Sequence, residues 1–206
     1  AQMKGVSNVP MWGVIDIGSN TIRLATYSVR EGRLYPMLNK KYAAGLASYI
    51  TEDRAISPGG IYKLTEVLSE IKSMLRYIQV QEIFPFATAS LRNSTNGREI
   101  AKHIRERFDF DVRILTGEEE AIFGYYGALS GQMGASGLVV DVGGGSAELS
   151  FFQDQQVLAA TSLPVGSLNL YKRFVSNLIP TDREMKEMQR EIKQQLRCLA
   201  LPEEKL

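Results

Sequence analysis

The segment VIDIGSNT at residues 14–21 recurs in the second half of the chain as VVDVGGGS at residues 139–146. In each copy an apolar strand pattern leads to an aspartate, Asp16 or Asp141, and then to a run of small residues that ends in Thr or Ser. A leucine follows three residues later in both copies, and an alternating hairpin pattern comes next. A single copy would be typical of an ordinary hairpin turn. Two copies in register indicate two related subdomains.

The small residues of both loops predict anion binding, because backbone N–H groups can turn inward where no side chain blocks close approach. An aspartate beside such a nest would repel phosphate unless it faced a divalent cation or a bound water, so Asp16 and Asp141 predict Mg²⁺ or another divalent cation. Glu148, two residues past the second loop, is a further candidate ligand beside Asp141. The predicted phosphate-binding residues of the loops are Gly18, Ser19, Asn20, Thr21, Gly143, Gly144, Gly145 and Ser146.

The rest of the chain predicts an α/β fold. Apolar residues fall alternately three and four apart after Ser57-Pro58, which predicts a long helix with serine as N-cap and proline at its first position. Further helices are expected at residues 96–108, from Thr116 and from Thr181. Because strands and helices alternate after an initial meander, we expect a mixed sheet with covered faces. Strands are expected at residues 12–16, 21–29, 33–40, 82–87, 111–115, 139–141, 147–152 and 157–162.

Composition excludes several classes of protein. The 206 residues carry a net charge of +1, so no bulk field draws the chain to nucleic acid or to a membrane. The single cysteine, Cys198, excludes an internal disulfide and a thiol-rich zinc site. No apolar run has transmembrane length, and residues 1–10 lack a signal-peptide core. We therefore expect a cytoplasmic protein with no nucleic-acid or membrane partner; the sequence does not choose between a monomer and a homodimer.

The only histidine, His103, lies in a helix pattern rich in charged residues and is expected on the solvated surface. Its isolation excludes Ser-His-Asp triads, Cys-His pairs and HExxH zinc sites. If the chain is an enzyme, its general base must be a carboxylate.

Three consecutive glutamates follow Thr116 and Gly117. Thr116 and Glu119 form a capping-box pattern, and Glu118 favours the positive end of the helix. Glu120 has no capping or packing role that the pattern explains. A carboxylate near a helix N-terminus stays ionised and can orient a water molecule. The alternative is a solvated acid of the first helical turn.

Four segments taken together resemble the exopolyphosphatase / guanosine pentaphosphate phosphohydrolase (Ppx/GppA) family of the actin / heat-shock ATPase / sugar kinase superfamily. The resemblance runs in order through residues 12–170, and no Walker A sequence is present. It implies an actin-like ATPase (ribonuclease H-like) domain at residues 1–125 and the start of a second, similar domain at residues 126–206. We expect residues 12–16 and 137–141 to be equivalent central strands of two similar sheets, with the loops at residues 18–21 and 143–146 facing one cleft. The four segments are residues 16–23, 89–92, 117–121 and 141–148.

The resemblance also implies roles for individual side chains. Glu120 corresponds to the family's general base, and Arg92 to a phosphate contact whose planar fork suits bidentate binding. A surface arginine near a helix start remains the alternative for Arg92. Arg23 is a weaker candidate for substrate binding, because an arginine on an alternating strand usually faces solvent.

The implied reaction is attack by water on the terminal phosphoryl group of polyphosphate or of guanosine pentaphosphate, and the sequence does not choose between these substrates. A small-molecule kinase of the same superfamily would need an aspartate base, and only Asp16 is available. Glu120 argues against a non-catalytic phosphate- or nucleotide-binding actin-like module. The superfamily's further glycine motif and the family's histidine-rich C-terminal domain are missing after Ser167. We expect either a shortened chain or a natural short form that pairs with another polypeptide.

Overall fold

The computed structural model describes residues 9–129, 136–197 and 199. The chain divides into two compact units, one made of residues 1–87 and 94–114 and the other of residues 88–93 and 115–206. Helix α4 (Gly117–Ala128) belongs to the second unit because it packs on strands of the second sheet. The second compact unit therefore begins before residue 125, the end of the first domain expected from the sequence. The boundary between the two domains stays a prediction.

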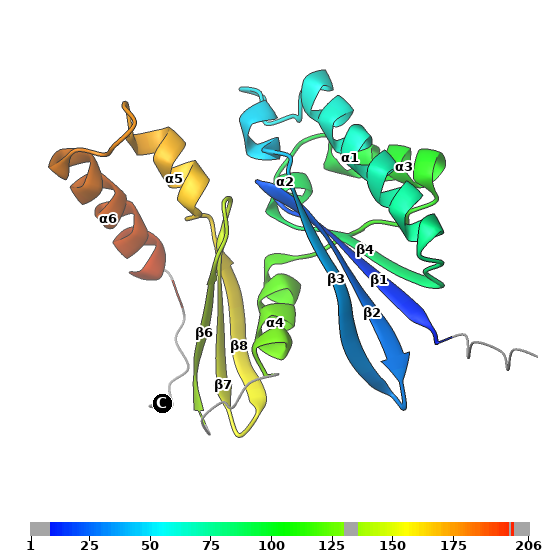
Figure 1. Ribbon diagram of the computed structural model, residues 1–206. Coiled ribbons are helices and arrows are strands. Elements are labelled where there is room, and N and C mark those ends of the chain that lie inside the picture. The colour runs from blue at the N-terminus through cyan, green and yellow to red at the C-terminus, as the bar shows by residue number, and fades with distance from the viewer. Residues whose placement is uncertain (1–8, 130–135, 198, 200–206) are drawn as a thin grey trace, which may run out of the picture. The chain divides into compact units, whose positions relative to one another are not determined.

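The first unit is built on a five-stranded mixed sheet of order β3-β2-β1-β4-β5 (Figure 1). The first three strands form the expected antiparallel meander, and β4 and β5 add in parallel. The sequence predicted all five strands. Their bounds are β1 Met11–Ile17, β2 Thr21–Arg30, β3 Arg33–Ala43, β4 Glu82–Ala87 and β5 Arg113–Ile114.

Helices α1 (Pro58–Tyr77) and α3 (Gly97–Phe108) pack against each other in this unit, and the short helix η1 (Leu46–Tyr49) packs on α1. Proline opens α1 as predicted, and Leu64, Leu68, Ile71 and Leu75 of its apolar stripe are buried. Each such buried side chain contributes about 1.5–3 kcal/mol relative to exposure. A Cβ at Gly13 would lie 3.0 Å from Leu75 Cδ2, so α1 approaches β1 closely because that residue is glycine.

The second unit is built on a three-stranded antiparallel sheet of order β6-β7-β8. The central strand β7 is buried on both faces. Helix α4 packs on one face, and on the other a core cluster includes Leu149, Phe151, Leu163 and Leu170. The remaining bounds are α2 Ala89–Arg92, β6 Ser136–Val142, β7 Ala147–Gln153, β8 Gln156–Leu163, α5 Ser167–Phe174 and α6 Asp182–Arg197.

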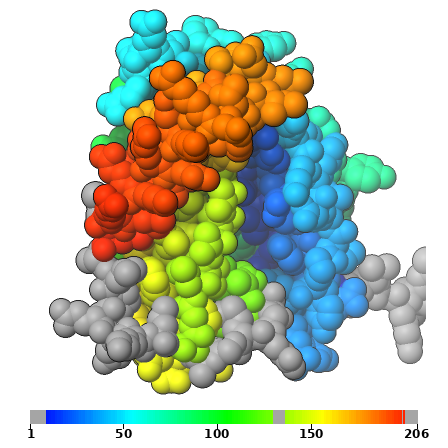
Figure 2. All heavy atoms as spheres, turned by 90° about the vertical axis from the view of Figure 1, so that its left-hand side faces the viewer, coloured from blue at the N-terminus to red at the C-terminus, as the bar shows by residue number. Residues whose placement is uncertain are grey.

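One expectation about the repeat is wrong: β6 is not a central strand. In the first unit β4 follows α1 and pairs in parallel with β1, whereas no described strand follows α6 to do the same for β6. Leu138, Val140 and Val142 are consequently exposed on β6. Their counterparts Ile15 and Ile17 on β1 are fully buried. In Figure 2 the yellow-green surface around β6 lies beside the orange and red of α5 and α6.

Helix α6 begins as the sequence predicts. The Thr181 N–H donates to Glu184 Oε2 at 2.7 Å, and the Glu184 N–H donates to Thr181 Oγ1 at 3.3 Å, which completes the capping box. None of the helices in the described part of the chain is long and apolar enough to cross a membrane. Cys198 lies outside the described residues.

Candidate active site

The glycine loop between β6 and β7 is held from one side by helix α5. The N–H groups of Ser167 and Leu168, at the start of α5, donate to the carbonyl oxygens of Gly143 and Gly144, both at 2.9 Å. The side-chain amide of Asn169 donates to the carbonyl oxygen of Gly145 at 2.8 Å. The carbonyls of the three loop glycines therefore face α5.

The N–H groups of the same peptides point the other way, because a trans peptide directs its C=O and N–H to opposite sides. Among the described residues, the N–H groups of Gly144, Gly145 and Ser146 donate to no backbone acceptor. Adjacent unengaged N–H groups of this kind form an anion nest. Close packing behind the nest needs Gly166, where a Cβ would lie 2.4 Å from the Gly144 carbonyl. The Ser146 side chain is buried.

The loop between β1 and β2 has the same construction. Gly18 N–H donates to the Thr21 carbonyl at 3.0 Å, and the equivalent bond closes the second loop at 2.9 Å. The carbonyls of Ser19 and Asn20 each accept, at 2.8 Å, from N–H groups of the segment after β3. The N–H groups of these two residues donate to no backbone acceptor in the described part of the chain. Each loop is thus locally a nest; that both face one cleft stays a prediction.

The two loops differ in the charges beside them. Asp141 on β6 lies directly opposite Glu148 on β7, so two carboxylates share one face of the second sheet. Glu148 is 4% exposed, and its Oε1 accepts from Ser162 Oγ at 2.7 Å. In the first unit Asp16 lies opposite Arg23, which is exposed, so the equivalent carboxylate faces a cation.

A metal ion would find two protein carboxylates in the second unit, Asp141 and Glu148. No group of three or more His, Cys, Asp or Glu that could hold a metal occurs among the described residues. Mg²⁺ commonly binds through one or two carboxylates together with substrate phosphates and water, so a two-carboxylate site fits it. Like charges directly opposite each other on neighbouring strands are destabilising, and a cation would remove that penalty.

The first turn of α4 is capped as the sequence predicts. Thr116 Oγ1 accepts from the Glu119 N–H at 3.1 Å, and Glu119 Oε2 accepts from the Thr116 N–H at 2.8 Å. Gly117 starts the helix directly above β8: a Cβ there would lie 2.4 Å from Ser162 Cβ. The N-terminus of α4 therefore packs on the residue that bonds Glu148.

Glu120 leaves this turn toward Arg92, the last residue of α2. Arg92 Nη1 lies 2.6 Å from Glu120 Oε2, and the two side chains are 18% and 20% exposed. The same Nη1 donates to the Leu115 carbonyl at 3.1 Å. Arg92 Nε and Nη2 make no hydrogen bond to a described residue. The guanidinium thus holds the carboxylate with one nitrogen and keeps donors for a further anion.

Sequence reasoning singled out Arg92 and Glu120 separately and missed that they pair. It also missed Ser162, which donates to Glu148, and Asn169, which holds the glycine loop. One signal of the loop support was present: a glycine follows the third strand in both halves, as Gly45 and Gly166, and begins the segment that bonds the loop carbonyls. The repeat therefore extends past the hairpins.

The duplicated strand–nest–hairpin unit on two sheets defines the actin-like ATPase class of fold. The crystal structure of the Aquifex aeolicus Ppx/GppA family member superposes with a TM-score of 0.75 at 28% identity, covering 91% of this chain and 62% of that one. The Ppx/GppA phosphatase family model matches residues 25–203. This chain belongs to the Ppx/GppA phosphatase family.

The sequence of this chain also matches curated relatives that carry two different protein names. Exopolyphosphatase 1 of Mycobacterium tuberculosis is 29% identical over 180 residues, which are 84% of this chain and 51% of the relative. Guanosine-5'-triphosphate,3'-diphosphate pyrophosphatase of Vibrio cholerae is 31% identical over 166 residues, which are 80% of this chain and 33% of the relative. The chain thus spans between a third and a half of these relatives.

Proposed function

We propose that this chain carries phosphate-binding and water-orienting parts of a phosphoanhydride hydrolase that releases terminal phosphate from inorganic polyphosphate or guanosine pentaphosphate. The observation that carries the proposal is the Arg92–Glu120 pair, 2.6 Å apart, in the same compact unit as the nest at residues 143–146. A binding module needs the nest alone. A hydrolase also needs a base that can orient water, and Glu120 supplies a partly exposed carboxylate for that task.

The proposed role of each residue follows from the hydrogen-bond donors that have no acceptor within the described part of the protein. The N–H groups of Gly144, Gly145 and Ser146 bind phosphate oxygens, and the nest at Ser19 and Asn20 is of the same kind. Arg92 keeps Nη1 on Glu120 and offers its remaining guanidinium donors to a phosphate oxygen. Glu120 orients the attacking water and accepts its proton, a contribution typically on the order of 10²–10⁴ in rate.

We assign the divalent cation to Asp141 and Glu148. Their opposed carboxylates carry two negative charges on one face, whereas Asp16 is opposed by Arg23. Asp16 is a further candidate on the sequence, and the arginine opposite it weakens that assignment. When bound, Mg²⁺ would offset the charge of the phosphates. The residues of the chain contribute orientation: Ser162 fixes the Glu148 carboxylate by its hydrogen bond at 2.7 Å.

The relatives' names support both substrate classes, because one group is named for polyphosphate and the other for the guanosine nucleotide. Both substrates present a terminal phosphoanhydride to the same base. The choice between them stays open in the proposal, as do the cytoplasmic location and the oligomeric state. Arg23, exposed on β2, stays a weak candidate for contact with the substrate.

The test is phosphate release from long-chain polyphosphate and from guanosine pentaphosphate. Both the 206-residue chain and a polypeptide extended to the length of its relatives should be assayed. We expect the extended polypeptide to release phosphate from at least one substrate and ATP plus candidate sugars to give no phosphorylated acceptor. Phosphorylation of an acceptor without phosphate release would favour the kinase instead.

A further inference from the structure

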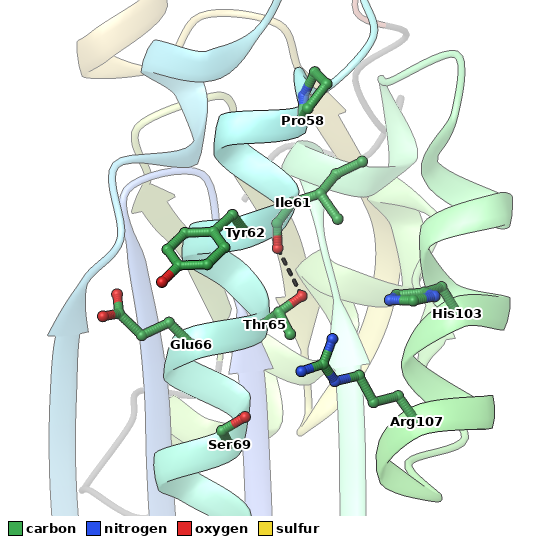
Figure 3. Close-up of a pocket in the computed structure, with 8 residues that line it drawn as sticks. All are labelled: Pro58, Ile61, Tyr62, Thr65, Glu66, Ser69, His103 and Arg107. Carbon is green, nitrogen blue, oxygen red and sulfur yellow. Dashed lines mark hydrogen bonds between the residues drawn. The ribbon is translucent and has the colours of Figure 1, made fainter.

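A groove of about 470 Å³ runs between α1 and α3 of the first unit (Figure 3). This volume falls in the range of small-molecule sites, about 300–1,000 Å³. Its lining comes from one face of α1 and from two residues one turn apart on α3. The lining residues are Pro58, Ile61, Tyr62, Thr65, Glu66, Ser69, His103 and Arg107.

Hydrogen bonds hold the two helices at both ends of the groove. At one end Asn96, before α3, receives a hydrogen bond from the Ile56 N–H and donates one to the Ile56 carbonyl, both at 2.9 Å. At the other end Lys72 Nζ of α1 donates to the carbonyl oxygen of Phe108 at 2.6 Å. The walls are therefore fixed before any ligand arrives, which lowers the entropic cost of binding.

The lining changes from apolar to polar along α1. Pro58 and Ile61 line the groove near the start of the helix, and Ser69 lies two turns further on (Figure 3). The Tyr62 ring lies at the rim on the side of α1 away from α3, as Glu66 does. His103 and Arg107 project from α3 toward α1 beside this polar end. A ring can lie at the first end while an anionic group lies at the second.

The two donor side chains that α3 contributes to the groove, His103 and Arg107, have no counter-ion among the described residues. On the outer side of α3 Lys102 pairs with Glu106 at 3.8 Å, and Arg105 pairs with Asp111 at 3.5 Å. The Arg107 guanidinium lies 5.6 Å from the centroid of the Phe108 ring.

Glu66 is the acid that lines the groove, and it does not neutralise these donors. Its Oε2 lies 2.8 Å from Lys63 Nζ, and its side chain points away from α3 (Figure 3). Thr65 donates its hydroxyl proton to the Ile61 carbonyl at 2.7 Å, so of the two aliphatic hydroxyls in the lining Ser69 is the one that can donate to a ligand.

We propose that this groove binds a small phosphomonoester that carries a ring, of the size of a mononucleotide, at a site separate from the phosphate nests. A phosphomonoester presents three acceptor oxygens, which match the guanidinium of Arg107, the imidazole of His103 and the hydroxyl of Ser69. The ring packs on Ile61 and Pro58, with Tyr62 at the rim. This site does not depend on the hydrolase reaction.

His103 makes the test direct, because it is the only histidine of the chain and lies in the groove. The imidazole C–H signals in the NMR spectrum of the 206-residue chain report on this site alone. We expect AMP to shift them saturably, while adenosine and inorganic phosphate, each lacking half of the ligand, bind at least tenfold more weakly. The absence of a saturable AMP shift at millimolar concentration would overturn the proposal.

Two variants that remove the same charge distinguish specific binding of AMP in the groove from general electrostatic attraction of an anion to α3. Arg107→Gln should weaken AMP binding at least tenfold, because it removes a charged donor from the groove. Arg105→Gln removes the same charge from the outer side of α3 and should change the affinity less than twofold. Equal losses in both variants, or no loss in Arg107→Gln, would contradict a built site.

Tyr62→Ala tests the rim of the apolar end without endangering the fold, because this side chain is 72% exposed. We expect it to weaken AMP binding and to leave binding of inorganic phosphate unchanged. Unchanged AMP affinity in this variant would exclude ring packing at that rim. None of these residues lies in the proposed hydrolytic site, so failure here leaves the hydrolase proposal intact.

Discussion

At the scale of single residues, the contact between Glu120 and Arg92 distinguishes Glu120 from the other acids in the first turn of α4. The sequence pattern assigns Glu120 no capping or packing role; in the structure it accepts from Arg92 Nη1, which also donates to the Leu115 carbonyl. A purely structural ion pair would use the arginine's planar fork more completely, because bidentate geometry is the favoured mode of arginine–carboxylate pairs. Here one nitrogen holds the acid, and the remaining donors are available to a phosphate.

Asp141 and Glu148 lead to a prediction about metal binding that needs no turnover. Mg²⁺ should raise the melting temperature of the chain, since a ligand at about 100 times its dissociation constant adds about 2.7 kcal/mol of stability. Asp141→Asn should abolish that rise and, without Mg²⁺, should melt no lower than the parent chain, because it relieves repulsion between opposed carboxylates. Thermal melts with Mg²⁺ and with a chelator provide the measurement.

The control for this experiment is Asp154→Asn, the same change in the turn between β7 and β8. It should leave the Mg²⁺-dependent rise intact. A rise that survives Asp141→Asn, or disappears in both variants, would show that the cation binds elsewhere.

At the scale of elements, the start of α6 predicts a pH dependence. Glu184 accepts from the backbone N–H and hydroxyl groups of Thr181 and Ser176, and these bonds, the Thr181 backbone bond above all, lower the pKa of Glu184 to about 2. A carboxyl whose pKa is depressed in the folded state stabilises that state above its unfolded pKa, about 4.3. The contribution falls as the pH drops from there through about 2.

Glu184→Gln should therefore lower the melting temperature at pH 7, and the gap to the parent chain should narrow as the pH approaches 2. The carboxylate is exposed, so we expect a modest effect that salt weakens. Glu187→Gln, which loses only its exposed pair with Arg183 at 3.1 Å, is the comparison and should show a smaller gap. A gap for Glu184→Gln that stays constant with pH would refute the role of the carboxylate.

The helices also show which structural features could be predicted from local sequence patterns. The stripe of α1 and the capping boxes at Thr116 and Thr181 are local patterns, and the structure confirms them. Helices α2 and α5 were not predicted. They have four and eight residues, no side-chain cap, and in the case of α5 an N-terminus bonded to a loop more than twenty residues earlier. Local propensity does not encode such long-range contacts.

The candidate site divides in the same way. The nests could be predicted because the same loop pattern occurs twice in the sequence, at residues 18–21 and 143–146. The pairing of Arg92 with Glu120 could not, because 28 residues and two elements separate the partners and no period connects them. The wrong prediction about β6 has a similar origin: a repeat indicates that two strands are alike but not which neighbours each one finds.

At the scale of the whole molecule, the two halves share a fold, but equivalent strand residues are buried in the first half and exposed in the second. Ile15 on β1 is 0% exposed, whereas its counterpart Val140 on β6 is 53% exposed. Ile15→Lys should therefore prevent folding of the first unit, because it buries a charge without a partner. Val140→Lys should change stability by about 0.5 kcal/mol or less, as surface substitutions do. Denaturant unfolding of both variants provides the measurement.

A large destabilisation by Val140→Lys would contradict an open face on β6. It would indicate that a second copy of the chain covers Val140 in solution. Sedimentation of the parent chain would then show a dimer.

The central claim is that Glu120 is the general base, and a matched pair of substitutions in the polypeptide extended to the relatives' length tests it most directly. Glu120→Gln keeps the shape and still accepts from Arg92, but it cannot take a proton from water, so phosphate release should fall by about 10²–10⁴ with substrate affinity unchanged. Glu119→Gln preserves the capping box and should leave the rate nearly unchanged. Equal effects of the two substitutions, or a critical Glu119, would contradict the account.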